Sequence, residues 1–224
     1  MYWILFIGIT IVSFLVQANL KSKFDKYSRV RLPNGMTGRE VAQKMLYDNG
    51  IYDVDVVSTE GSLTDHYNPA TKTVNLSRDV YSQCSISAAA VAAHECGHAL
   101  QHATAYGPLE MRSNLVPVVS FASKWVTWVI LAGILLVQSF PQILMAGIVL
   151  FGMTTLFSFI TLPVEINASY RATQWLRNAG LVDQQTYPYA VDTLKSAAYT
   201  YVVAAISSLA TLVYYIGILN GRRD

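Results

Sequence analysis

Charged residues and cysteines are both scarce in this chain of 224 residues. Asp, Glu, Lys and Arg together make up 13% of it, and the net charge is only +2. A chain with so little positive charge lacks the basic footprint of a nucleic-acid-binding protein. Its two cysteines, Cys84 and Cys96, are too few for a disulfide framework, and free thiols suit a reducing compartment.

Long uncharged runs occupy much of the sequence instead. Hydrophobic residues make up 53% of the chain, and the mean hydropathy is +0.34, which is more apolar than most soluble domains. Four runs are about long enough to span a bilayer, although Lys124 interrupts the second: residues 2–20, 115–137, 140–162 and 197–219. The first run lacks a basic n-region and a small-residue cleavage site, which favours a retained anchor over a cleaved signal peptide.

A helix-forming stretch lies between the first two apolar runs. Residues 88–106 are rich in alanine and contain no proline, which favours a helix. Ser87 is the expected N-cap of this helix, and Gly107 with Pro108 is the expected stop signal. The stretch contains three of the four histidines of the chain, so it is the first place to look for chemistry.

On that helix His94 and His98 share one face, with Cβ atoms about 5–6 Å apart. Two imidazoles at this spacing can bind one Zn²⁺ ion, and Glu95 lies beside them as a general base in the HExxH pattern. His102 is about 12 Å along the helix from His94, too far to share the ion, and is expected to lie at the surface or behind the ligands. Cys96 is interpreted as a small apolar filler.

Glu165 is a candidate third ligand. The third apolar run returns the chain to the membrane side of His94 and is followed at once by Pro163 and Glu165. The carboxylate would complete a His₂Glu set with an open fourth position. Alternatively, it is an N-terminal carboxylate of a helix that starts after Pro163, stabilised by the helix dipole. The residues alone leave both interpretations open.

The segment before the HExxH helix predicts a small mixed structure. Thr37 and Glu40 form a capping box that opens a short amphipathic helix. Two β-type runs follow, over residues 53–57 and 63–76, and the second folds back at residues 68–71 as a hairpin. An exposed strand beside a zinc helix could pair with an extended peptide, or the hairpin could be purely structural. His66 in this ribbon is interpreted as a surface residue.

These features predict a mainly α membrane protein with about four transmembrane helices and a small α+β zincin-like metalloprotease domain with a β-hairpin. The predicted parts are a transmembrane anchor (1–20), a zincin-like catalytic region (21–114), a transmembrane hairpin (115–162), a helical segment with the third ligand (163–196) and a C-terminal transmembrane helix with its tail (197–224). Lys124 fits if its helix begins well outside the bilayer, or if it lines a wet cleft near the metal.

Basic residues are unevenly distributed between the two sides of the predicted membrane. The side that carries HExxH has a cluster after the first run: Lys21, Lys23, Lys26, Arg29 and Arg31. The other side has only Arg222 and Arg223. By the positive-inside rule, the catalytic region should therefore face the cytoplasm of a bacterial cell membrane.

Several motifs in this order resemble the YugP-type neutral zinc metallopeptidases of bacterial membranes, a family akin to the HtpX and CAAX prenyl protease group. The motifs are LTDHYNPATKTVNLS (63–77), VAAHECGHALQH (91–102), MRSNLVPV (111–118) and TLPVEINASYRA (161–172). The resemblance implies that His94, His98 and Glu165 are zinc ligands and that Glu95 is the catalytic acid/base. Where the family usually has Asp, this chain has Asn167, so an amide replaces a carboxylate expected to orient a ligating histidine.

The HExxH motif and this resemblance together predict a gluzincin-like zinc endopeptidase that is embedded in the membrane. It is expected to hydrolyse peptide bonds in membrane or misfolded proteins. The alternative is a metal-binding membrane scaffold or transporter without proteolytic activity. The expected partners are a peptide or membrane-protein substrate and the lipid bilayer, without nucleic acid. Nothing in the sequence indicates an oligomeric state.

Overall fold

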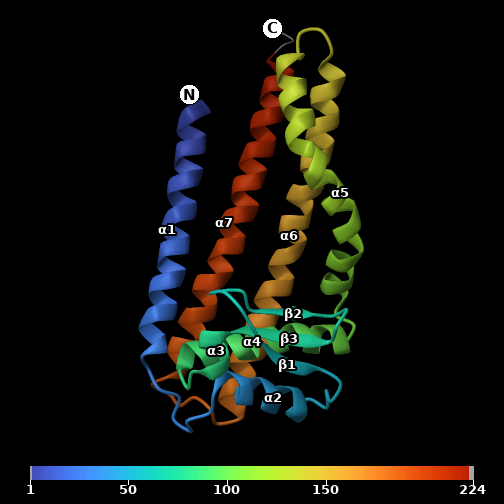
Figure 1. The fold of residues 1–224 in the computed structure, drawn as a ribbon. Helices are drawn as coiled ribbons and strands as arrows, with labels where there is room; N and C mark the ends of the chain where they lie inside the picture. Colours follow the sequence, from blue (N-terminus) through green and yellow to red (C-terminus); the bar gives the residue numbers. More distant parts are fainter. Residues whose placement is uncertain (1, 222–224) are drawn as a thin grey trace.

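Four long helices form the extended part of the molecule (Figure 1). The computed structural model describes residues 2–221. The long helices are α1 (Tyr2–Ser28), α5 (Gly107–Leu135), α6 (Pro141–Asn178) and α7 (Tyr187–Asn220). All four are long and apolar enough to cross a membrane, which confirms the predicted class of mainly α membrane protein. The start of α1, the α5–α6 connection and the end of α7 lie at one end of the bundle.

The smaller elements gather at the opposite end of the bundle (Figure 1). They are α2 (Gly38–Asp48), β1 (Asp55–Thr59), β2 (His66–Asn68), β3 (Thr73–Ser77), α3 (Arg78–Ser82) and α4 (Ile86–Ala103). The strand order is β1-β3-β2, with β1 parallel and β2 antiparallel to β3. The predicted hairpin is therefore confirmed, and β2 is an edge strand. Its turn is closed by the Asn68 side chain, which accepts hydrogen bonds from the amides of Ala70 and Thr71.

The ends of α4 differ from those predicted. Ser85, not Ser87, is the N-cap, and its hydroxyl accepts a hydrogen bond from the Ala88 amide. Ser87 is fully buried in the first turn of the helix. Gly107 and Pro108 do not end α4 but open α5, where proline is tolerated because the first helical amides have no intrahelical partner.

Helix α6 runs without interruption through Pro163. The third apolar run and the segment with Glu165 are therefore one helix. Proline lacks the amide hydrogen that would bond the Phe159 carbonyl, so packing must hold the helix together here. Because Glu165 lies in the helix interior, the interpretation of Glu165 as a helix N-terminal carboxylate is wrong.

Helix α4 is the centre of the packed core. Alanines that are at least 98% buried line it, and they let its neighbours approach closely: Ala88, Ala89, Ala90, Ala92, Ala93 and Ala99. A Cβ atom added at Gly97 would lie 2.7 Å from the Ala168 carbonyl oxygen of α6, so only glycine permits this crossing. Cys96 is fully buried against the Ala42 carbonyl, as expected of an apolar filler. The predicted capping box of Thr37 and Glu40 is confirmed at the start of α2.

Candidate metal centre

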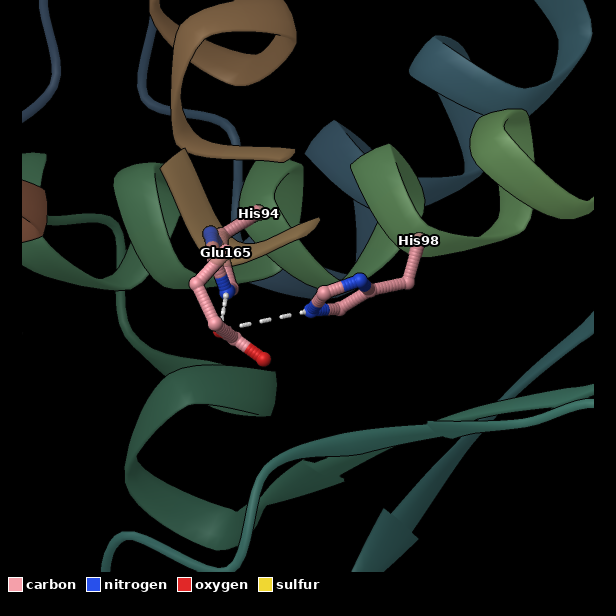
Figure 2. Close-up of side chains that lie close together, drawn as sticks. All are labelled: His94, His98 and Glu165. Atoms are coloured by element: carbon pink, nitrogen blue, oxygen red, sulfur yellow. Dashed lines mark ion pairs between the residues drawn. The ribbon is translucent and has the colours of Figure 1, made fainter. Parts of the chain in front are cut away.

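Two helices bring three candidate ligands together (Figure 2). Successive turns of α4 carry His94 and His98, whose ring centroids lie 4.8 Å apart. Glu165 reaches them from α6, and its Oε2 atom lies 3.4 Å from Nε2 of His94 and 3.7 Å from Nε2 of His98. The third candidate ligand thus comes from 67 residues further along the chain than His98.

The three side chains fit a metal ion. Their ligand atoms all lie within 4.8 Å of one another. The Glu165 side chain is only 4% exposed, and its Oε2 atom makes no hydrogen bond to any described residue. A buried carboxylate oxygen without a donor is costly, and a cation shared with two imidazoles would satisfy it. The His₂Glu donor set is one that zinc accepts in catalytic sites.

Glu95 lies beside this cluster but points to the sheet. Its carboxylate is buried, and its Oε2 atom accepts a hydrogen bond of 3.0 Å from the Tyr67 amide of β2. The edge strand therefore fixes the position of the carboxylate predicted to be the general base. Two hollows reach the cluster: a larger one lined by His102 and Arg112, and a smaller one lined by Leu20 and Phe24. Glu95 lies in the walls of both, so its carboxylate is accessible to a substrate or to water.

Comparison with known proteins identifies the family. The family model described as "Putative neutral zinc metallopeptidase" matches residues 2–220. The chain is also 45% identical over 225 residues to "Putative membrane protease YugP" of Bacillus subtilis (strain 168), a match that covers 98% of this chain and 99% of the relative. The chain belongs to the neutral zinc metallopeptidase family. No solved structure gives a significant match.

Because the family is one of zinc peptidases, Zn²⁺ is the cofactor of this metallopeptidase. In the metal-free protein, protons can bind the nitrogen atoms that would otherwise bind the metal. Burial lowers the pKa of His98, but the contact with Glu165 and the negative charge of Glu95 outweigh it, so the net pKa is raised above 6.5. Zinc binding to the metallopeptidase must therefore displace a proton more often as the pH falls.

The buried side-chain amide of Gln101 contacts the His98 ring at Nδ1, the nitrogen that does not face Glu165. Gln101 is fully buried, and its Nε2 atom donates to the Val164 carbonyl at 2.7 Å and to Asn167 Oδ1 at 3.1 Å. Its Oε1 atom lies 3.0 Å from Nδ1 of His98 and must be the acceptor, because the amide nitrogen is already used. His98 therefore carries its proton on Nδ1, which leaves the Nε2 lone pair for the metal.

Among the described residues Asn167 makes no hydrogen bond to His94 or His98, whereas a residue at its position was expected to orient a ligating histidine. Its Oδ1 atom accepts hydrogen bonds from Gln101 and, at 2.8 Å, from Nε of Arg171. The amide at position 167 thus supports His98 only through Gln101. His94 has a different support, because its Nδ1 atom lies 3.1 Å from the Ser169 hydroxyl of α6.

Sequence reasoning missed two residues of the site. Arg112 lies in the larger hollow, with Nη1 3.9 Å from Oε1 of Glu165, and its buried Nε atom has no hydrogen-bond partner among the described residues. Tyr201 lines both hollows. The only sequence signal for Arg112 was its place in the MRSNLVPV motif, and Tyr201 lies in an apolar run that gave no signal.

The remaining candidates lie outside the cluster. His102 is exposed, as predicted, and lines the larger hollow, with its ring centroid 6.2 Å from that of Tyr67. His66 is also exposed, and its Nδ1 atom contacts the Thr64 carbonyl. Lys124 lies exposed on α5 and lines neither of the two hollows at the cluster, which favours the first interpretation of this residue, a helix that begins outside the bilayer.

Proposed function

We propose that the protein is a membrane-embedded zinc endopeptidase of the gluzincin type, in which His94, His98 and Glu165 bind zinc and Glu95 is the acid/base. One observation carries the proposal: a buried carboxylate oxygen of α6 without a hydrogen-bond donor lies against both imidazoles of the HExxH helix. Membership in a zinc metallopeptidase family supports the same conclusion.

Zinc, when bound, acidifies water and polarises a carbonyl oxygen. Glu95, held in place by the Tyr67 amide, takes the proton of the attacking water and later passes it to the departing amine. Arg112 places a positive charge in the larger hollow, where it favours the negative charge that develops on the carbonyl oxygen. Gln101 keeps the His98 ring in the tautomer that leaves Nε2 free.

The edge strand gives the substrate a place to lie. In β2 the Tyr67 amide points away from β3 and toward Glu95, so the open edge of the sheet faces the catalytic carboxylate. An extended peptide that lies beside this edge would pass directly in front of Glu95, whose carboxylate accepts a hydrogen bond from the Tyr67 amide. Peptides that are unfolded, or segments leaving the membrane, can adopt such an extended form, which supports membrane or misfolded proteins as substrates.

The site faces the cytoplasm in this proposal. The catalytic elements lie at one end of the four long helices, and the chain on that side carries the basic cluster after the first apolar run (Figure 1). The positive-inside rule assigns such a side to the cytoplasm.

The test is cleavage of casein by purified protein in detergent, wild type beside Glu95→Gln. Wild type should contain zinc and degrade casein, and a chelator should stop it. Glu95→Gln should retain zinc but lose about a hundred- to ten-thousandfold in rate, because general acid/base catalysis contributes roughly 10²–10⁴-fold. Unchanged activity would remove Glu95 from the mechanism. Zinc without any zinc-dependent proteolysis by wild type would favour the alternative, a metal-binding membrane scaffold or transporter.

A further inference from the structure

Two hollows of different chemistry meet at the candidate metal centre. The larger, of about 300 Å³, has the basic and imidazole side chains of His66, His102 and Arg112 in its wall. The smaller, of about 160 Å³, lies on the side of α1 and α7. Both hollows include His94, Glu95 and other residues of the site, so a bound peptide would have one hollow on each side of its reacting bond.

The smaller hollow has apolar walls from three helices. Leu20 and Phe24 come from α1, Val91 from α4, and Leu194 and Ala197 from α7. A cavity of about 150 Å³ with such walls holds a benzene-sized group. The smaller hollow therefore has room for one aliphatic or aromatic side chain.

Leu63 adds an apolar group from the loop between β1 and β2. Its φ angle is +58°, a left-handed conformation that is uncommon for a bulky residue. The residue is 48% exposed although it is apolar. An exposed leucine held in this conformation beside the hollow is available to cover a side chain that enters it.

Helix α1 is fixed where it forms this wall. The Asp192 carboxylate of α7 accepts hydrogen bonds from Lys23 at 2.5 Å and from the Tyr27 hydroxyl at 2.7 Å. The Tyr27 ring also stacks on Tyr189 at 4.9 Å. The first transmembrane helix is therefore part of the site as well as an anchor.

We infer that the smaller hollow is a specificity pocket, which binds an aliphatic or aromatic side chain of the residue next to the scissile bond. This inference rests on the proposed function and adds the class of sequence that is cleaved. The pocket lies on one side of His94 and Glu95 only, so the preference should apply to one flank of the bond. The opposite flank faces the hollow that contains Arg112 and should accept polar residues.

Peptides from a digested bacterial lysate, with cleavage sites mapped by mass spectrometry, give the first measurement. Aliphatic and aromatic residues should be enriched at one of the two positions that flank the cleaved bond. A pair of quenched fluorescent peptides, with Leu or Gly at that position, then gives the size of the preference. Burial of a leucine side chain should raise kcat/KM by about ten- to a hundredfold over glycine.

Ala197→Leu fills the pocket, and Ala204→Leu is its matched control. Ala197 lines the hollow, whereas Ala204 is exposed on the same helix and does not line it. Ala197→Leu should lower the Leu-over-Gly preference by about tenfold while zinc content is retained. Ala204→Leu should keep the wild-type preference. Equal preferences in the two variants, or no apolar enrichment on either flank, would overturn the inference.

A binding measurement separates this inference from the proposed function. Zinc-loaded Glu95→Gln protein is titrated with the uncleaved Leu and Gly peptides by calorimetry, with and without Ala197→Leu. Tighter binding of the Leu peptide that Ala197→Leu removes would support the pocket, even if wild type hydrolyses nothing and the proposed function fails. Equal affinities for the two peptides, together with casein cleavage by wild type, would refute the pocket and leave the peptidase intact.

Discussion

The two helices of the candidate metal centre differ in how they are held. Helix α4 has 18 residues and lies in the core among alanines, so the positions of His94 and His98 follow from helical spacing alone. Helix α6 has 38 residues, crosses the membrane and contributes Glu165 beyond an internal proline. The histidine half of the site is therefore set by local helix geometry. The Glu165 half depends on α5 and α6 bringing the chain back to the level of α4. Variants that disturb each half separately test this difference.

The largest effect is expected for Glu165→Ala, which removes the whole contribution of α6. Partners behind a metal ligand are worth about 10–100-fold in affinity, so loss of a ligand should weaken zinc binding by more than about a hundredfold. Competition with a chelator measures this, and circular dichroism should show an unchanged helix content. Full zinc retention would contradict the assignment and point to His102 or His66 as the third ligand.

Gly97→Ala should separate the two helices and have the next largest effect. The added Cβ atom would lie 2.7 Å from the Ala168 carbonyl oxygen, and such overpacking costs about 1–3 kcal/mol. Thermal unfolding in detergent and zinc affinity should both decrease. Gly152→Ala in α6 is the control, because its Cβ atom meets nothing within 4 Å and alanine favours a helix by up to about 1 kcal/mol. Equal behaviour of the two variants would show that α4 and α6 do not cross at this point.

The supports of the two histidines should differ in strength. Gln101→Met removes the side-chain donor to the Val164 carbonyl and leaves Nδ1 of His98 without its acceptor at a fully buried position, and should weaken zinc binding by about 10–100-fold. Ser169→Ala removes one contact of 3.1 Å to His94 at a half-buried position. Its effect on zinc affinity, measured with the same chelator, should be smaller. A larger effect of Ser169→Ala than of Gln101→Met would show that the support of His94 matters more than the support of His98.

The smallest effect is expected for Asp65→Asn, which concerns the sheet beside the site. Burial raises the pKa of Asp65, Glu95 adds to this rise, and the hydrogen bonds from Ser77 oppose it. A carboxyl group with a raised folded pKa stabilises the protein only at low pH, and this contribution is lost as the pH rises through the folded pKa. The Tm of Asp65→Asn relative to wild type should therefore increase between about pH 4 and pH 7 in metal-free protein. A difference in Tm that does not change with pH would contradict this prediction.

The sequence predicted what depends on short-range pattern. Helical spacing predicted the pairing of His94 with His98, and turn residues predicted the hairpin before them. It predicted the wrong N-cap for α4, because Ser85 and Ser87 both suit a cap and only burial in the fold distinguishes them. Arg112 and Tyr201 had no local signature, since their positions in the site depend on how α5 and α7 pack against α4 and α6.

The unbroken course of α6 also links the bilayer to the chemistry. Between Pro141 and Glu165 the helix rises about 36 Å, so a small change of tilt at one end displaces the carboxylate sideways at the other. Membrane helices respond to lipid thickness by tilting. Because α4 is held in the core rather than in lipid, its imidazoles would not follow that movement. Lipids of different chain length should therefore change the fit of the carboxylate to the imidazole pair, which would make this peptidase sensitive to the thickness of its membrane.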